Sequence, residues 1–181
     1  MKKILLVICS FFMLCGCNMA DINNTPTKQV EKFLNGYQTL DKDVLKNLDK
    51  IVEKEPTLTK EQQEEYRDIL KKHYEKLDYE IKDETINGNN ATVKVEIEVN
   101  DYSETLKNVL ERKVQHPEEF LDGNQNYNEN IFQEYKLNAL KDSEERIKYT
   151  LYITLTKIDD KWTLDTLADT DEEKILGIYQ Y

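Results

Sequence analysis

The most regular hydrophobic pattern in the chain lies between residues 147 and 167. Apolar and polar side chains alternate there with the period of two that is typical of a β-strand with one buried face. The apolar face carries Tyr149, Leu151, Ile153 and Leu155, and the other face carries Thr150, Tyr152, Thr154 and Thr156. Asp159 and Asp160 interrupt the alternation, which resumes at Trp162. The pattern therefore predicts a β-hairpin over this stretch.

Another pair of strands is expected earlier in the chain. Residues 91–99 alternate in the same way, with valine, isoleucine and alanine on one face and threonine, lysine and glutamate on the other. An Asn-Gly turn signal at residues 87–90 precedes them, and residues 79–86 form a less regular strand pattern before that turn. These two strands are therefore predicted to form a second hairpin.

Helical periodicity accounts for most of the remaining chain. Apolar residues recur at intervals of three and four over residues 26–37, 41–48, 59–77, 103–114 and 130–140. Thr25-Pro26 and the pair Thr59 and Gln62 are typical helix starts. The polar segment 116–128 is expected to be a loop, and residues 175–179 a short terminal helix or strand. This order predicts an α+β fold, with an antiparallel sheet of about four strands packed on helices.

The first residues have the features of an export signal. Lys2 and Lys3 precede an apolar run that ends at Leu14, shorter than the roughly 17–25 residues of a membrane-spanning helix. The sequence Leu14-Cys15-Gly16-Cys17 resembles a bacterial lipobox, which implies lipidation of Cys17. We therefore expect a cleaved lipoprotein signal peptide over 1–16, a lipidated cysteine and tether over 17–25, and a single α+β domain over 26–181.

The composition restricts the partners of the mature chain. The whole chain has 25 basic and 36 acidic residues, and loss of the two leader lysines leaves 23 basic residues and a charge of -13. This charge disfavours nucleic acid and anionic lipid, so membrane attachment is expected to depend on the acyl chains of Cys17. Only Cys17 remains after cleavage, so no internal disulfide is expected.

Three segments resemble a known family. They are the helix start at 26–34, the strand that begins Ala91-Thr92-Val93, and the hairpin at 155–164. Together they look like the nuclear-transport-factor-2-like (cystatin-related) lipoproteins of low-GC bacteria, although Asp160 stands where a glycine often occurs. The resemblance covers most of residues 26–167 and implies a curved sheet that wraps a long helix into a cone-shaped roll. That family includes enzymes and binding modules, so it implies a fold and not a function.

Few residues are candidates for a functional site. His73, on the apolar stripe of its helix, is either an acid–base group at a pocket mouth or a hydrogen-bonded histidine at the edge of the core. Tyr152, on the polar face of its strand, is a candidate contact residue. Trp162 is expected to be a core anchor. Packing is expected to bury Tyr37, Tyr66, Tyr79, Tyr135 and Tyr149, and it does not obviously account for Tyr74, Tyr102, Tyr152, Tyr179 and Tyr181.

No metal site or cofactor is expected. His73 and His116 are far apart in the sequence, which argues against a zinc site. Two oxygen-rich segments begin like calcium loops, but their twelfth positions are Lys94 and Gln133, where a bidentate glutamate is needed. A solvated loop is the expected structure of 116–128, and calcium binding there remains open.

These observations favour a membrane-tethered lipoprotein on the extracytoplasmic face of the cell membrane, acting as a non-catalytic binding or interaction module. An envelope protein or peptide is the expected partner, and we expect a monomer because charged side chains occupy the outer face of the predicted sheet. Two alternatives stay open. One is a small hydrolase or isomerase that uses His73 and nearby carboxylates in a cone pocket. The other is an accessory subunit of an envelope complex.

Overall fold

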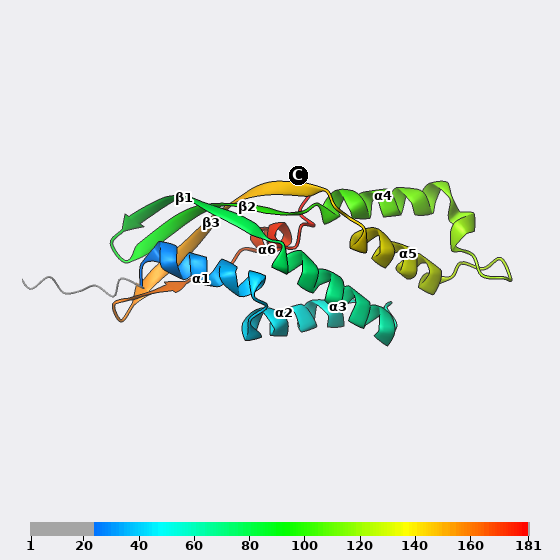
Figure 1. Cartoon of the computed structure of the whole chain (residues 1–181), viewed down its shortest axis with the longest axis horizontal. Helices are drawn as coiled ribbons and strands as arrows, with labels where there is room; N and C mark the ends of the chain where they lie inside the picture. The colour runs from blue at the N-terminus through cyan, green and yellow to red at the C-terminus, as the bar shows by residue number, and fades with distance from the viewer. Residues whose placement is uncertain (1–23, 181) are drawn as a thin grey trace, which may run out of the picture.

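The structure, a computed structural model, describes residues 24–180 and has an elongated α+β architecture (Figure 1). One half holds an open antiparallel sheet with helices against it, and a helical hairpin extends from the other half. In chain order the elements are α1 (Pro26–Gln38), α2 (Lys42–Glu53), α3 (Lys60–Glu75), β1 (Asp78–Asn87), β2 (Asn90–Asn100), α4 (Tyr102–Gln115), the 3-10 helix η1 (Pro117–Phe120), α5 (Glu129–Lys141), β3 (Arg146–Ile158), β4 (Lys161–Leu164) and α6 (Asp169–Ile175).

The sheet confirms the expected hairpins. Its four strands lie in the order β1-β2-β3-β4, with every neighbouring pair antiparallel. Asp159 and Asp160 have φ angles of 48° and 61°, the left-handed conformation that a tight two-residue hairpin turn requires. Aspartate tolerates this conformation better than most residues do, so the turn forms without glycine.

One face of the sheet forms the core. The alternating residues of β2 and β3 are buried as their pattern predicted, because α1, α3 and α6 contribute apolar side chains to the same cluster. Val30 and Leu34 of α1 are completely buried, as are Val93, Val95 and Leu151 of the strands. Apolar side chains therefore fill the space between α1 and the sheet.

The helices begin where the sequence indicates. The Thr25 hydroxyl accepts a hydrogen bond from the Lys28 backbone N–H at 3.2 Å. At the start of α3, the Gln62 N–H donates to the Thr59 hydroxyl at 3.2 Å, and the Thr59 N–H donates to the Gln62 side-chain oxygen at 3.0 Å. This reciprocal pair is the predicted capping box.

The C-terminal element differs from its expectation. The terminal helix α6 covers residues 169–175, so it begins within the acidic run and ends where the helix or strand was expected to begin. Asp169, Asp171 and Glu172 occupy its first turn, where carboxylates interact favourably with the helix dipole. A short helix has too few turns to show periodicity, so its local signals are this charge preference and Gly177, which follows the last turn with a φ angle of 71°, as glycine does at the end of many helices.

Several aromatic residues also differ from their expectations. Tyr74 and Tyr102, for which the sequence offered no packing role, are buried, whereas Tyr135 is exposed on α5. Trp162 is half-buried at the margin of the core, with the Lys157 ammonium 6.0 Å from its ring, so it is not the central anchor that we expected. The strand pattern defines which face Trp162 occupies, but β4 lies at the edge of the sheet, where burial is incomplete.

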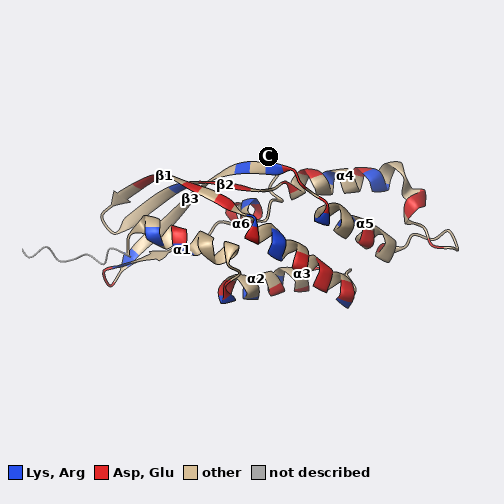
Figure 2. Cartoon of the chain, viewed as in Figure 1, with Lys and Arg blue, Asp and Glu red and all other residues tan. Residues whose placement is uncertain are grey.

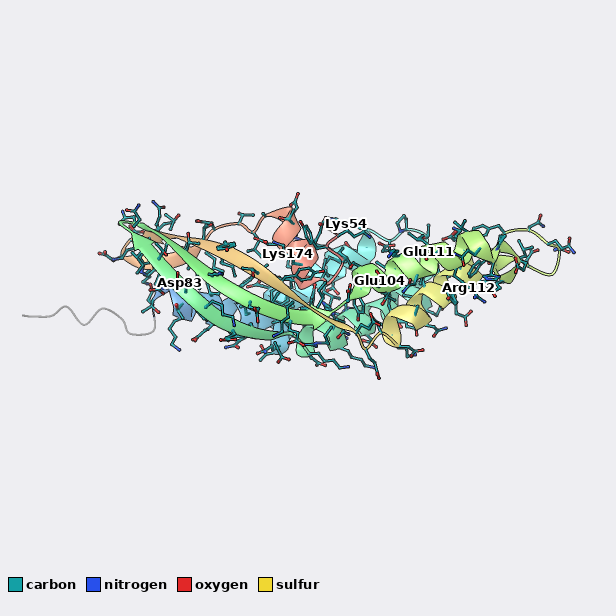
Figure 3. All side chains as sticks on the ribbon, turned by 90° about the horizontal axis from the view of Figure 1, so that it is seen from above. Lys54, Asp83, Glu104, Glu111, Arg112 and Lys174 are labelled. Atoms are coloured by element: carbon teal, nitrogen blue, oxygen red, sulfur yellow. The ribbon has the colours of Figure 1, made fainter. Side chains whose placement is uncertain are left out.

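The segment between β2 and β3 forms the helical hairpin, which we call the arm: α4, η1 and α5. Val109, Phe120 and Phe132 make a small apolar cluster of their own between its helices. Glu104, Glu111 and Arg112 lie along α4, from its first turn toward the far end of the arm (Figure 3). The arm therefore has a local core in addition to the main one.

Candidate functional site

An open groove of about 460 Å³ lies between α1, α2, β4 and the residues that lead into α6. This volume lies within the usual range of small-ligand sites, roughly 300–1,000 Å³. Residues of the core, among them Tyr37 and Val44, form part of its lining.

The groove has an apolar floor and an acidic rim. Its apolar lining residues, all buried or half-buried, are Phe33, Tyr37, Val44, Leu164 and Leu167, and its exposed carboxylates are Asp41, Asp43, Asp165 and Glu172. Lys32 is its one lysine or arginine. An apolar surface bordered by carboxylates favours a ligand that combines an apolar body with a positive charge.

A close helix contact shapes one end of the groove. Asp41 caps α2 by accepting hydrogen bonds from the Asp43 and Val44 backbone N–H groups at 3.0 and 2.9 Å. A Cβ on Gly36 would lie 2.6 Å from the Asp41 Oδ2 atom, so only glycine allows α1 and the Asp41 side chain to approach this closely. The capping carboxylate is thereby held at the groove.

The burial and the charges of this site affect the pKa of Tyr37. Burial raises the pKa of the Tyr37 phenol to about 12, and the negative charges of Glu172 and Asp41 act in the same direction. The phenol therefore stays neutral at physiological pH and can donate a hydrogen bond. The two carboxylates come from α6 and from the start of α2, so this electrostatic site exists only after the chain folds.

His73 is not at the mouth of the groove. Its side chain is 1% exposed, Nε2 donates to the Ile175 carbonyl at 2.8 Å, and its ring stacks on Tyr102 with 4.7 Å between the ring centres. Burial, helped by the positive charge of Arg146, lowers the pKa of His73 to about 4. The hydrogen-bonded alternative considered for this histidine therefore describes its position.

Tyr152, another sequence candidate, lies apart from the groove. It is 59% exposed on the outer face of β3, and the Lys94 ammonium lies 5.9 Å from the centre of its ring. The prediction for Tyr152 therefore concerns a surface separate from the cavity. Cys17 lies outside the described residues.

No metal centre is evident in the described part of the chain. Residues 24–180 contain no group of three or more histidine, cysteine, aspartate or glutamate side chains that could hold a metal ion. In the segment 116–128, Asp122 Oδ1 accepts hydrogen bonds from the Asn124 and Asn126 backbone N–H groups at 2.8 and 2.9 Å. This carboxylate therefore orders its own loop.

The sequence did not reveal the groove, because its residues come from four separate segments. The acidic residues near 41–43 and 165–172 were visible, but nothing local indicated that they face one another. No helix within residues 24–180 is both long enough and apolar enough to cross a membrane. Figure 2 shows acidic residues on both the sheet half and the arm, so acidity alone does not mark the site.

Comparison with protein-family models, with curated proteins and with solved structures finds no match for this chain.

Proposed function

We propose that this protein is a membrane-tethered lipoprotein of the cell envelope that acts as a non-catalytic binding module. The leader and the lipobox-like sequence at Cys17 support the tether. The groove supports binding, because it combines a ligand-sized volume with an apolar floor and charges positioned by the fold. That combination is the observation on which the proposal rests.

The proposed ligand is a segment of an envelope protein or peptide in which a basic side chain lies beside apolar ones. Asp43 and Glu172 are exposed, and their carboxylates form no ion pair with another residue in the 24–180 range. A lysine or arginine of the ligand can therefore interact with them while its neighbours cover Phe33 and Leu167. Such a ligand fits both the shape and the charge of the groove.

The geometry of the tether supports a defined orientation. The Trp162 backbone N–H donates to the Asn24 side-chain oxygen at 2.6 Å, which holds the start of the described chain against β4. From Cys17 to Asn24 the chain can extend at most about 25 Å. In this proposal the sheet end therefore stays near the membrane, and the arm, at the opposite end, points away from it (Figure 1).

We also propose a fold family and a monomeric state for this protein. The antiparallel sheet with α1 across one face supports a cone-shaped roll of the nuclear-transport-factor-2-like type. A monomer is supported by the outer face of the sheet, where Lys148 lies 3.3 Å from Glu96, because ion pairs are depleted at the centre of stable interfaces.

A second candidate function is an accessory subunit of an envelope complex, and the arm favours it. Leu110 and Val114, one turn apart on α4, are 58% and 79% exposed. Neighbouring apolar side chains at such exposure are typical of a surface that contacts another protein. The two candidate functions differ in which surface meets the partner.

We expect Cys17→Ser to yield a protein that either keeps its leader or is released from the membrane, because the acyl chains are the proposed anchor and the chain is too acidic to bind anionic lipid. Fractionation of cells, with the leader checked by mass spectrometry, measures this. A Cys15→Ser variant is the matched control and should stay with the membrane. Cys17→Ser protein that loses its leader and still resists a high-salt wash would contradict the proposed anchor.

Photo-crosslinking in intact cells tests where the partner binds. We expect a photoreactive residue at Asn47, in the groove, to capture a protein or peptide, and we expect Asp43→Asn with Glu172→Gln to reduce the yield several-fold. The same photoreactive residue at Tyr152 and at Val114 samples the outer sheet face and the arm. Capture from Val114 but not from Asn47 would favour the accessory subunit and overturn the groove as the binding site.

A further inference from the structure

Two exposed isoleucines lie at the hairpin ends of the sheet, residues 86–90 and 157–161. Ile86 is the next-to-last residue of β1 and is 52% exposed, and Ile158 ends β3 and is 56% exposed. The Lys157 backbone N–H donates to the Asn89 carbonyl at 2.7 Å, which holds the two hairpin ends side by side. Both isoleucines therefore lie at one end of the molecule, opposite the arm (Figure 1).

The two isoleucines lie on opposite faces of the sheet. Ile86 pairs with Ala91 and Ala91 pairs with Leu155, so all three share the face that forms the core. Ile158 lies three residues after Leu155 and therefore on the other face. A protein seated on either face of the sheet could cover only one of the two side chains. A surface that meets the sheet end-on can contact both.

The helix against the sheet begins too late to cover Ile86. The Thr27 backbone N–H donates to the Glu84 carboxylate at 2.9 Å, so the start of α1 is level with Glu84. Ile86 is two residues nearer the turn on the same face. Half-buried Trp162 lies at this end as well, and tryptophan is enriched where proteins meet the headgroup region of a membrane. The hairpin ends thus combine uncovered aliphatic side chains with an aromatic one.

The start of the described chain lies at the same end. The Trp162 backbone N–H donates to the Asn24 side-chain oxygen, and the next residue, Lys161, pairs with Ile158. From a lipidated Cys17 to Asn24 the chain can extend at most about 25 Å. The proposed tether therefore leads to the hairpin that carries Ile158.

The local charges do not oppose contact with a neutral lipid surface. Residues 86–90 contain no charged side chain, and residues 157–161 contain two lysines and two aspartates. The Lys157 ammonium lies 3.4 Å from an Asp160 carboxylate oxygen. Charges farther than about 8 Å are screened at physiological ionic strength, so the net charge of the whole chain has less influence here. The exposed aspartates limit the contact to the surface of the bilayer.

We propose that the two hairpin ends rest on the lipid surface, with Ile86 and Ile158 at the border between headgroups and acyl chains. This inference rests on the proposed lipid tether at Cys17, because two isoleucines are too few to hold a protein on a membrane by themselves. The tether raises the effective concentration of the hairpin ends at the membrane, so that a weak contact becomes populated. The contact fixes the orientation of the domain, with the arm pointing away from the membrane.

Fluorescence quenching by lipid tests this contact. Asn89→Cys allows a fluorophore to be attached at the hairpin ends, and Asn124→Cys allows the same fluorophore to be attached in the arm. The full lipidated chain, purified from membranes, is reconstituted into phosphatidylcholine vesicles that contain nitroxide-labelled phosphatidylcholine. We expect strong quenching at residue 89 and none at residue 124. Equal quenching at both positions, or none at residue 89, would overturn the proposal.

Serine variants connect the quenching to the isoleucines. Ile86→Ser combined with Ile158→Ser should reduce the quenching at residue 89 several-fold, because both side chains lose the gain from apolar burial. Leu110→Ser combined with Val114→Ser is the matched control, because these arm side chains are 58% and 79% exposed, and it should leave the quenching unchanged. An equal reduction by the two pairs contradicts the contact.

Flotation of the same vesicles measures the anchor separately. A chain that floats with the vesicles but is not quenched at residue 89 has the lipid anchor and lacks the hairpin contact, which overturns this inference alone. A chain that does not float lacks the anchor, which overturns the proposed tether and the contact that rests on it.

Discussion

Gly177→Ala is expected to lower the free energy of unfolding by roughly 3 kcal/mol, because it adds a steric clash to an unfavourable backbone conformation. Gly177 has a φ angle of 71°, and a Cβ there would lie 2.1 Å from the Asn100 carbonyl oxygen and 3.1 Å from His73 Cε1. The Ser103 N–H donates to the Gly177 carbonyl at 2.8 Å, so the same residue attaches the C-terminal segment to α4. Movement of Gly177 would therefore disturb both contacts.

Thermal unfolding followed by circular dichroism measures this loss, which corresponds to a fall in Tm of about 6–12 °C for a chain of this size. Gly88→Ala is the matched control, because Gly88 has a similar φ angle of 61° but no atom within 4 Å of the added Cβ. It should cost only the backbone strain, about 1 kcal/mol. Equal losses of unfolding free energy in the two variants would contradict the expected steric clash with Asn100.

We expect the free energy of unfolding of the wild-type protein to decrease as the pH falls below 6.5, because of His73. The total decrease is about 3 kcal/mol, since each unit of pKa shift corresponds to about 1.36 kcal/mol. The folded pKa of about 4 lies below the ordinary value of 6.5. Between these values the unfolded chain binds the proton and the folded chain does not. The contribution is therefore complete above pH 6.5 and is lost progressively as the pH falls to about 4. The titratable and charged groups around the ring are Tyr102, Lys72, Lys76, Lys141 and Arg146.

Denaturant unfolding at pH 7 and pH 4 measures the effect as a difference between wild type and His73→Gln. The variant keeps an N–H donor for the Ile175 carbonyl but has no titrating group at position 73. The two proteins have the same carboxylates, so the contribution of the carboxylates cancels in the difference. We expect the wild type to lose about 3 kcal/mol more than His73→Gln over this interval. Histidine NMR titration of the wild type is an independent check, since a His73 midpoint near 6.5 would contradict the prediction even if the variant folds poorly.

Much of the sheet and most of the helix starts could be predicted, because the physical causes are local. The alternation in β2 and β3 defines the buried face of each strand regardless of what covers it. Thr25, Thr59 and Asp41 begin helices through hydrogen bonds to N–H groups two or three residues away. Tight turns likewise depend on a few adjacent residues. For these features the neighbouring sequence contains nearly all of the necessary information.

The candidate sites could not be predicted, because their residues come together only in the tertiary structure. The acidic groove depends on α1, α2, β4 and α6 meeting, because its lining residues come from all of them. The burial of His73 follows from the C-terminal segment, 102 residues away, which supplies the Ile175 carbonyl. Periodicity indicates that a side chain lies on an apolar stripe, but not which distant group covers it. The sequence by itself thus determined the elements and their buried faces, whereas packing between distant segments decided where charge and cavities meet.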